Sequence, residues 1–316
     1  METIRLIKPT ATAFCQTDFT HKGIYKFIEK CARVCYKSED NITDDSYLKF
    51  VENLLIKGHD RPLEFGTVHL KMNEEKFKLI KRILFENNLW NDIWIKYNID
   101  YDNDTYYITT NYRYIFEIES KLPEIYINKY IVSEDNYYFP KRITVHMILN
   151  RATMDSFRTH VTLSHLAEST RYCNYTKDKF GNKITFIIPD WLSIPQGEYN
   201  MYLFKTEFDK TIYKLMDTDS NTFIKGDDNK TQMFIESCNI ASKNYHNLLT
   251  NGCKPQEARD ILPLDIKSEL ISCGFRDAWL NFIDRRKHPT AHPMAHNLAI
   301  DIYNNIKPFI DNDYIQ

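Results

Sequence analysis

Residues 141–189, KRITVHMILNRATMDSFRTHVTLSHLAESTRYCNYTKDKFGNKITFIIP, contain the pattern that decides the fold. Apolar residues alternate with polar ones along 141–149, which predicts a strand. A helical pattern runs from Arg151 to about Thr162, and a polar, turn-rich segment follows it. The short apolar run 183–189 ends at Pro189 and predicts a second, buried strand.

Strand and helix patterns are mixed along the rest of the chain. We predict strands over 3–10, 64–72 and 264–274, and helices over 23–37, 45–58, 198–216, 230–252 and 255–262, with a helical C-terminal part. A doubly wound parallel sheet would need regular strand–helix–strand units, which this order does not provide. The sequence therefore predicts an α+β fold, with an antiparallel sheet and flanking helices.

No repeat, low-complexity tract or linker rich in Pro, Gly or Ser divides the 316 residues. We therefore expect a single domain over residues 1–316. A segment rich in Tyr and Asn, from about 74 to 140, lies between two alternating stretches and is interpreted as an insertion with short helices and hairpins.

Composition excludes several classes of protein. The 41 Lys and Arg residues nearly balance 43 Asp and Glu, a formal charge of −2, so we expect no nucleic-acid partner. The sequence has no run of about 18 apolar residues and no signal-peptide pattern at its start, so we expect no membrane partner and a cytoplasmic location. Seven scattered cysteines without CxxC spacing indicate neither a disulfide framework nor a zinc site.

The densest polar cluster is SHLAESTRYCNYTKDKFGN, residues 164–182. Ser169 and Arg171 together are suited to a phosphate, because a hydroxyl and a planar guanidinium both donate to its oxygens. Glu168 would then accept a hydrogen bond from the ligand. A solvated turn with local ion pairs is an equally good interpretation from composition alone.

Two further polar clusters lie toward the C-terminus. In KPQEARDILPLDIKSEL, Arg259 follows a helix start and precedes Pro263. In WLNFIDRRKHPTAHPMAHNLA, Asn281 and Arg286 precede His288, His292 and His296, which have the four-residue spacing of some zinc sites. Prolines interrupt this run and the HExxH glutamate is missing, so we predict no metal site.

Five segments, taken in order, resemble the flavin-dependent thymidylate synthases. They are ARVCYKSED (32–40), IKGHDRPLE (56–64), the stretch 141–189, GCKPQEARDILP (252–263) and NFIDRRKHPTAHP (281–293). The resemblance implies an α+β homotetramer that binds FAD and dUMP in clefts shared between subunits. It also implies reductive methylation of dUMP to dTMP, with methylenetetrahydrofolate as carbon donor and NADPH reducing the flavin.

The same resemblance implies a role for individual residues. Arg286 matches the catalytic arginine thought to lie against the pyrimidine and to favour its N3-deprotonated form. The implied substrate-binding residues are Ser156, Glu168, Ser169, Thr170, Arg171, Arg259 and Arg286, with Ser169, Arg171 and Arg259 at the phosphate. The implied flavin-binding residues are His59, Arg61, Thr159, His160, Val161, Ser164 and Asn281.

The sequence departs from the family pattern mainly where the flavin is expected. Thr159, His160 and Val161 stand in place of the signature Arg-His-Arg, and Leu166, Ala167, Phe65 and Ser156 replace other polar residues. Two lost charge-assisted hydrogen bonds would weaken cofactor binding by roughly two to four orders of magnitude. Arg158 is rotated by about a hundred degrees from position 159 on a helix, so we do not expect it to replace the missing arginine.

Three functions agree with this pattern. In the first interpretation, the chain is a divergent flavin-dependent thymidylate synthase, and Lys or Arg residues of the insertion replace the missing signature arginines. Alternatively, it is a paralogue that modifies another pyrimidine nucleotide at C5, for example by hydroxymethylation. In a third interpretation it is a catalytically silent nucleotide-binding homologue.

Overall fold

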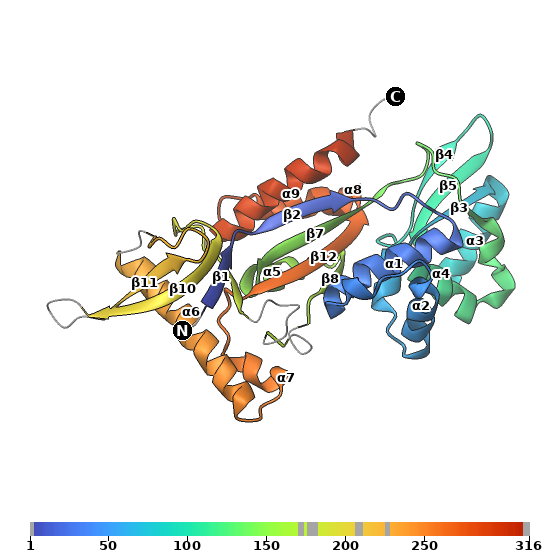
Figure 1. Cartoon of the computed structure of the whole chain (residues 1–316). Helices are drawn as coiled ribbons and strands as arrows, with labels where there is room; N and C mark the ends of the chain where they lie inside the picture. The colour runs from blue at the N-terminus through green and yellow to red at the C-terminus, as the bar shows by residue number, and fades with distance from the viewer. Residues whose placement is uncertain (1–2, 170–173, 176–182, 206–210, 225–227, 312–316) are drawn as a thin grey trace.

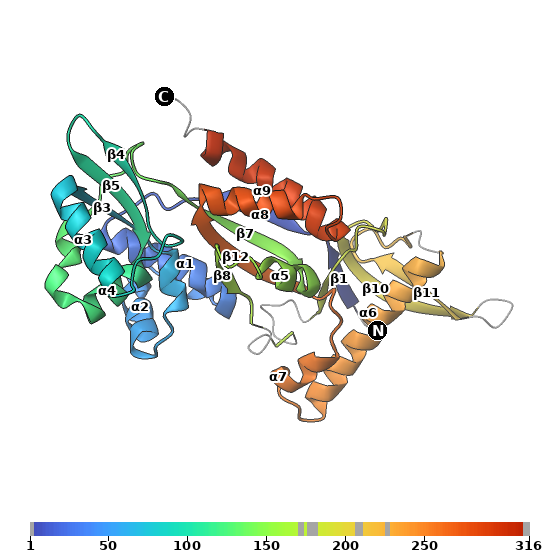
Figure 2. The same cartoon turned by 180° about the vertical axis from the view of Figure 1, so that it is seen from behind.

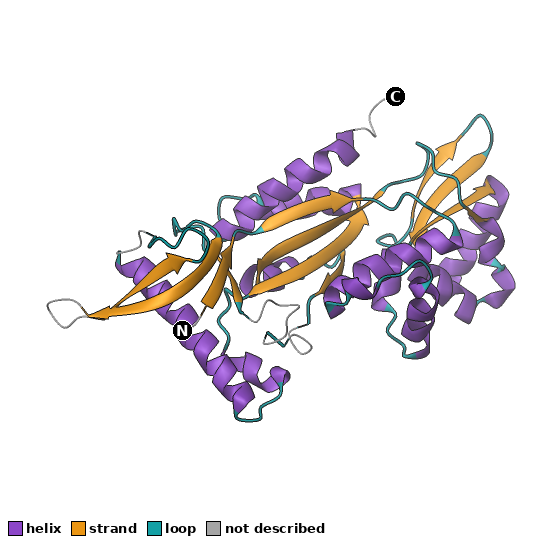
Figure 3. Ribbon diagram, viewed as in Figure 1, coloured by secondary structure: helices purple, strands orange, loops and turns teal. Residues whose placement is uncertain are grey.

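The computed structural model describes residues 3–169, 174–175, 183–205, 211–224 and 228–311. Within these residues, the strands form three four-stranded sheets that follow one another along an elongated molecule (Figure 1). Helices pack beside each sheet, as Figure 3 shows. Helices together with mainly antiparallel sheets confirm the predicted α+β class.

The central sheet has the order β2–β7–β12–β8 and is antiparallel throughout. Its strands are β2 (Thr10–Phe14), β7 (Arg142–Asn150), β12 (Lys267–Phe275) and β8 (Ser164–Ala167). Helices α8 (Arg276–Arg286) and α9 (Pro293–Asp311) cover one face (Figure 2). Alternate residues of β7, among them Val145 and Met147, are buried against fully buried Trp279 of α8, as the period-two pattern predicts.

Helix α1 (His21–Tyr36) packs against the other face of the central sheet. Its residues Phe27 and Cys31 are buried with Ile271 and Cys273 of β12. Thr20 caps the helix, because its side chain accepts a hydrogen bond from Gly23 N–H, and Lys37 ends it in the left-handed conformation. The end of α1 therefore lies over the start of β12.

The second sheet has the order β11–β10–β1–β9, with β1 (Thr3–Ile7) parallel to β9 (Thr185–Ile187). Strands β10 (Gly197–Lys205) and β11 (Thr211–Asp217) form a long antiparallel hairpin, and α6 (Asn229–Thr250) packs beside the sheet. The helix predicted over 198–216 was therefore wrong. Tyr199 and Met201 are buried at period two, and β10 pairs with β1, so strand pairing overrides the weaker helical pattern.

The third sheet has the order β4–β5–β3–β6. It consists of β4 (Lys96–Asp100), β5 (Thr105–Asn111), β3 (Thr67–Asn73) and β6 (Ile131–Val132), with helices α2 (Ser46–Ile56), α3 (Glu74–Glu86) and α4 (Tyr112–Lys121). Buried residues of α1 and α2 share one core with this sheet. We propose that residues 74–140 are an insertion into a single domain, whose helices and strands complete this core.

Short helices connect these layers. They are α5 (Arg151–Phe157), α7 (Pro255–Ala258), and the 3₁₀ turns η1 (Glu39–Asn41), η2 (Arg61–Phe65), η3 (Pro123–Ile125), η4 (Ile127–Tyr130) and η6 (Arg259–Ile261). No helix in the described part of the chain has both the length and the hydropathy needed to cross a bilayer.

Candidate functional site

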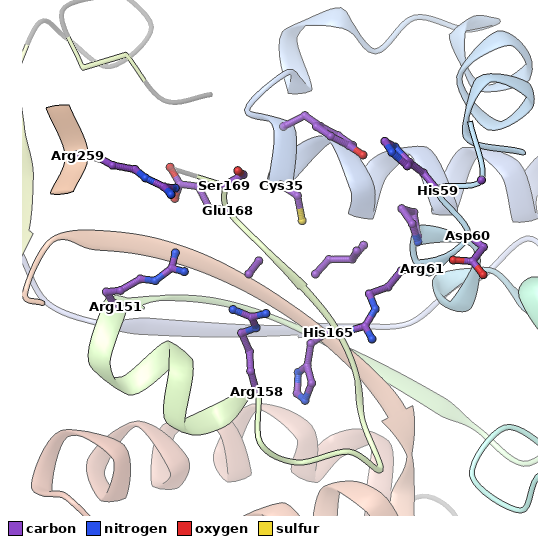
Figure 4. A pocket seen from close by; sticks show the side chains of 15 residues that line it. Cys35, His59, Asp60, Arg61, Arg151, Arg158, His165, Glu168, Ser169 and Arg259 are labelled. Carbon is purple, nitrogen blue, oxygen red and sulfur yellow. The ribbon is translucent and has the colours of Figure 1, made fainter. Parts of the chain in front are cut away.

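A cavity of about 600 Å³ lies at the β8 edge of the central sheet (Figure 4). We call it the arginine pocket. Its walls come from the end of α1, the segment leading into η2, both ends of α5, the end of β8 and the start of η6. It is lined by Cys35, Tyr36, Gly58, His59, Asp60, Arg61, Pro62, Arg151, Arg158, His165, Leu166, Ala167, Glu168, Ser169 and Arg259.

Four arginines line this pocket: Arg61, Arg151, Arg158 and Arg259. Arg151 and Arg158 both bond Asp155, at 3.5 and 3.4 Å, and that carboxylate is half exposed. Surface ion pairs of this length are weak, so they leave both guanidinium groups able to bind an anionic ligand. Guanidinium groups bind phosphate in a planar, bidentate way. The pocket is therefore suited to a ligand with phosphate groups.

Arg158 lines the arginine pocket together with Arg151. Arg151 and Arg158 are seven residues apart, which is two helical turns, so both side chains lie on the same side of α5. Thr159 turns away and accepts a hydrogen bond from Arg286 instead. Arg158 therefore lines the pocket, whereas Thr159 does not appear among its described lining residues. None of the described pocket-lining residues comes from 74–140.

The insertion nevertheless supports the pocket from outside. Arg113 of α4 forms an ion pair with Asp60 at 2.8 Å and a second one with buried Glu64. Because Asp60 lines the pocket, this contact holds the segment that carries His59 and Arg61. It also compensates the Asp60 carboxylate, so the pocket remains electropositive.

Glu168 is held at the end of β8 by contacts with β12. Its N–H donates to the Glu269 carbonyl at 2.7 Å, and Lys267 Nζ donates to its carboxylate at 3.0 Å. The Glu168 side chain is only 1% exposed. It lines both the arginine pocket and a neighbouring cavity of about 500 Å³, which Lys37, Lys183 and Tyr175 also line. Glu168 therefore separates the two cavities, and its contacts with β12 hold it in position.

Glu269 is the centre of the ionic network behind Glu168. It pairs with Lys37 at the end of α1, with Lys267 on its own strand, and with His146 Nε2 at 2.7 Å. Burial favours its neutral form, but the His146 hydrogen bond and the charges of Lys267 and Lys37 hold its pKa well below the usual range. Burial lowers the pKa of Lys267, yet Glu168 and Glu269 together raise it above its ordinary value. Both groups are therefore charged at neutral pH.

Arg286, at the end of α8, fixes the segment that follows α5. Its Nε donates to His160 Nε2 at 2.7 Å, and its Nη2 donates to the Ser156 carbonyl at 2.6 Å and to Thr159 Oγ1 at 3.0 Å. These contacts require His160 to be neutral, with its proton on Nδ1. Burial, followed by the charge of Arg286, lowers the pKa of His160 to about 4.

His165 extends this arrangement to the pocket. Its Nε2 donates to the His160 carbonyl at 2.9 Å, so its Nδ1 accepts from Ser272 Oγ at 2.8 Å. Burial lowers its pKa to about 4, despite the favourable backbone hydrogen bond. Because His165 lines the pocket, hydrogen bonds through the neutral residues His160 and His165 connect Arg286 to the pocket wall.

The structure brings together only part of the predicted site. His59, Arg61, Glu168, Ser169 and Arg259 all line the arginine pocket. Ser156, Thr159, His160 and Arg286 form the separate cluster just described. Val161 is 81% exposed, Asn281 is exposed on α8, Ser164 is buried in β8, and Thr170 and Arg171 lie outside the described residues. Among the described residues, no three His, Cys, Asp or Glu side chains gather as metal ligands.

Arg151 and His165 line the pocket but were not predicted from the sequence, and Arg158 was considered there only as a replacement for position 159 and rejected. The seven-residue spacing of the two arginines was a signal for a shared helix face. His165 carried no such signal, because its position depends on the pairing of β8 with β12.

The family model "Thymidylate synthase complementing protein" (Thy1) matches residues 141–310, more than half of the chain. The chain therefore belongs to this family, that of the flavin-dependent thymidylate synthases. This membership supports a methyltransferase-type enzyme of nucleotide metabolism.

Two solved structures are similar to the chain. They are crystal structures of the UMP/dUMP methylase PolB from Streptomyces cacaoi, bound with 5-Br UMP and with 5-Br dUMP. Their identities are 13% and 14% and their TM-scores 0.40 and 0.39, over 98% of this chain and 96% of theirs. No curated protein matches the chain.

Proposed function

We propose that this chain methylates C5 of a pyrimidine nucleotide, converting dUMP to dTMP with methylenetetrahydrofolate, NADPH and FAD. The observation that carries the proposal is the arginine pocket, where Ser169 and Arg259 meet beside Glu168. These residues are distant in sequence, and the family pattern assigns all three to the nucleotide. The volume of about 600 Å³ is typical of a small-molecule site.

In this proposal, Ser169 and Arg259 bind the phosphate of dUMP. Glu168 accepts a hydrogen bond from the nucleotide, and Lys267 fixes its carboxylate for that contact. A carboxylate positioned in advance loses little conformational freedom when the ligand binds. Thr170 and Arg171 are further proposed nucleotide contacts.

The donor set of the pocket also fits FAD. Arg61, Arg151 and Arg158 offer several guanidinium donors to a pyrophosphate, and His59 lies beside them. Bound there, FAD would supply the reducing equivalents that methylation by methylenetetrahydrofolate requires. Arg158 would take over the role of the signature arginine that is replaced by Thr159. The resemblance adds Val161, Ser164 and Asn281 as proposed flavin contacts.

Arg286 is the proposed catalytic cation, acting in a homotetramer. It does not line the arginine pocket of its own chain, so it would reach the pyrimidine in a pocket of a neighbouring subunit. Its bonds to Ser156, Thr159 and His160 orient the guanidinium group. A fixed cation beside the base would stabilise the negative charge that develops on the deprotonated pyrimidine.

The test is the complete reaction with purified protein. We expect visible flavin absorption, dUMP binding, and dTMP formation that requires methylenetetrahydrofolate and NADPH. Transfer to another pyrimidine nucleotide would favour the paralogue instead. Nucleotide binding without flavin or turnover would favour the silent homologue.

A further inference from the structure

Two neighbouring residues of the arginine pocket, Glu168 and Ser169, are held by main-chain hydrogen bonds to two different elements. Glu168 N–H donates to the Glu269 carbonyl of β12 at 2.7 Å, whereas Ser169 N–H donates to the Cys35 carbonyl of α1 at 3.2 Å. Cys35 lies in the last turn of α1, where carbonyl groups have no partner within the helix. The relative position of Glu168 and Ser169 therefore depends on how the end of α1 lies on β12.

An ion pair joins these two elements. Lys37, at the C-terminal cap of α1, pairs with the Glu269 carboxylate of β12. The two side chains are only 14% and 9% exposed, so solvent screens their attraction little. Lys37 also contacts Glu39 at 3.6 Å, which is a longer and more exposed ion pair. The contact with Glu269 is thus the one that holds the end of α1 on the sheet.

The same carboxylate also holds the Glu168 side chain, through Lys267. Lys267 and Glu269 are two residues apart on β12, so both side chains lie on the same face of the sheet. Lys267 Nζ bonds Glu269 Oε1 and, at 3.0 Å, Glu168 Oε2. His146 Nε2 donates to the other oxygen of Glu269 at 2.7 Å. Because both of its oxygens are bonded, the Glu269 carboxylate has a fixed orientation.

Glu269 is not among the described residues that line the arginine pocket. Buried ion pairs add little to stability, because the loss of hydration offsets the attraction, but they do fix side-chain positions. We propose that Glu269 is a positioning residue for the nucleotide, which holds Glu168 through Lys267 and Ser169 through Lys37. This inference rests on the proposed function, and it adds to that function a residue outside the pocket.

The test is a double-mutant cycle on dUMP binding, measured by calorimetry. Glu269→Gln removes the charge and keeps the shape of the side chain, and it should raise the Kd for dUMP at least about tenfold. Glu168→Gln should also raise this Kd. In Glu168→Gln/Glu269→Gln the rise should be at least about threefold smaller than the product of the two single effects, because the Glu168 contact can be lost only once.

Glu29→Gln is the matched control for a general loss of stability. Glu29 of α1 is 1% exposed and pairs with Arg33, but it is not among the described lining residues of either cavity beside Glu168. We expect an unchanged Kd for dUMP in this variant, even where its Tm falls as far as that of Glu269→Gln.

Lys37 provides a second test, which holds even if Glu269→Gln does not fold. Lys37→Met should raise the Kd for dUMP, whereas Lys37→Arg, which keeps the cation, should restore it. An unchanged Kd in Glu269→Gln, single effects that simply multiply, or an equal loss in Glu29→Gln would overturn this inference and leave the proposed function standing. Absence of dUMP binding by the unmodified protein would instead contradict the proposed function, and the inference with it.

Discussion

Arg286 Nε donates a 2.7 Å hydrogen bond to Nε2 of His160, and so links the end of α8 to the segment after α5. This contact gives His160 a role in holding the segment after α5. Its neutral ring accepts a hydrogen bond from a cation, a contact that an imidazolium could not make. The same segment carries Arg158 into the arginine pocket.

The proposed role of Arg286 predicts complementation between subunits. Arg286→Ala should lower kcat at least about 100-fold, because one preorganised charge contact is lost. Arg259→Ala should bind dUMP more weakly, because the phosphate contact is lost. In oligomers assembled from both variants, some pockets combine an intact Arg259 with an intact Arg286 of the neighbour. At a dUMP concentration too low to saturate Arg259→Ala, mixed oligomers should therefore turn over faster than either variant alone, whereas a rate no higher than the mean of the two variants would place both residues in the same chain's site.

The phosphate role of Arg259 predicts a separation of binding from chemistry. Arg259→Ala should raise the Kd for dUMP by about 10- to 100-fold, the cost of one charge-assisted hydrogen bond. Its kcat should change less, because a phosphate contact is nearly the same in ground and transition states. Calorimetry and initial rates measure the two effects, with exposed Arg82→Ala as matched control. A large loss of kcat with unchanged Kd would argue against the phosphate assignment.

The position of Arg158 predicts that this residue retains the flavin. Arg158→Ala should weaken FAD binding by about tenfold or more, because a charge-assisted hydrogen bond to the cofactor is lost. Flavin absorption after gel filtration, and titration of the apoprotein with FAD, provide the measurement. Arg285→Ala, on the exposed side of α8, is the control. Flavin retention equal to that of the unmodified protein would mean that Arg158 does not contact the cofactor.

His165 predicts a pH dependence of stability. Its folded-state pKa is lowered to about 4, so the unfolded chain binds a proton more readily than the folded one. Its contribution to stability is therefore complete above the unfolded pKa, near 6.5, and is lost as the pH falls toward 4. Between these values, His165→Gln should reduce the slope of the unfolding free energy by about 1.4 kcal/mol per pH unit.

Denaturant unfolding between pH 7 and 5 measures this slope, with exposed His288→Gln as control. A slope that is the same in His165→Gln and in the unmodified protein would show that His165 binds its proton as readily in the folded state as in the unfolded state.

The central sheet could be predicted because β7 alternates apolar and polar residues, and its apolar residues are buried in one core. Strand β12 is buried along almost its whole length, as expected of a short apolar run inside a sheet. The hairpin of β10 and β11 could not be predicted, because its Tyr, Phe and Lys residues also agree with a helical spacing. The pairing of β10 with β1 decides between a strand and a helix. For the site, family motifs identified Glu168, Ser169 and Arg259. The contacts of Arg286 could not be predicted, because they depend on how α8 packs against the end of α5.

The most direct test of the proposed function is calorimetric titration of the purified protein with dUMP, in parallel with Arg158→Ala/Arg259→Ala. We predict saturable binding of one dUMP per chain, weakened at least tenfold in the double variant. Absence of dUMP binding, or binding that is the same in both proteins, would contradict the assignment of the arginine pocket as the nucleotide site.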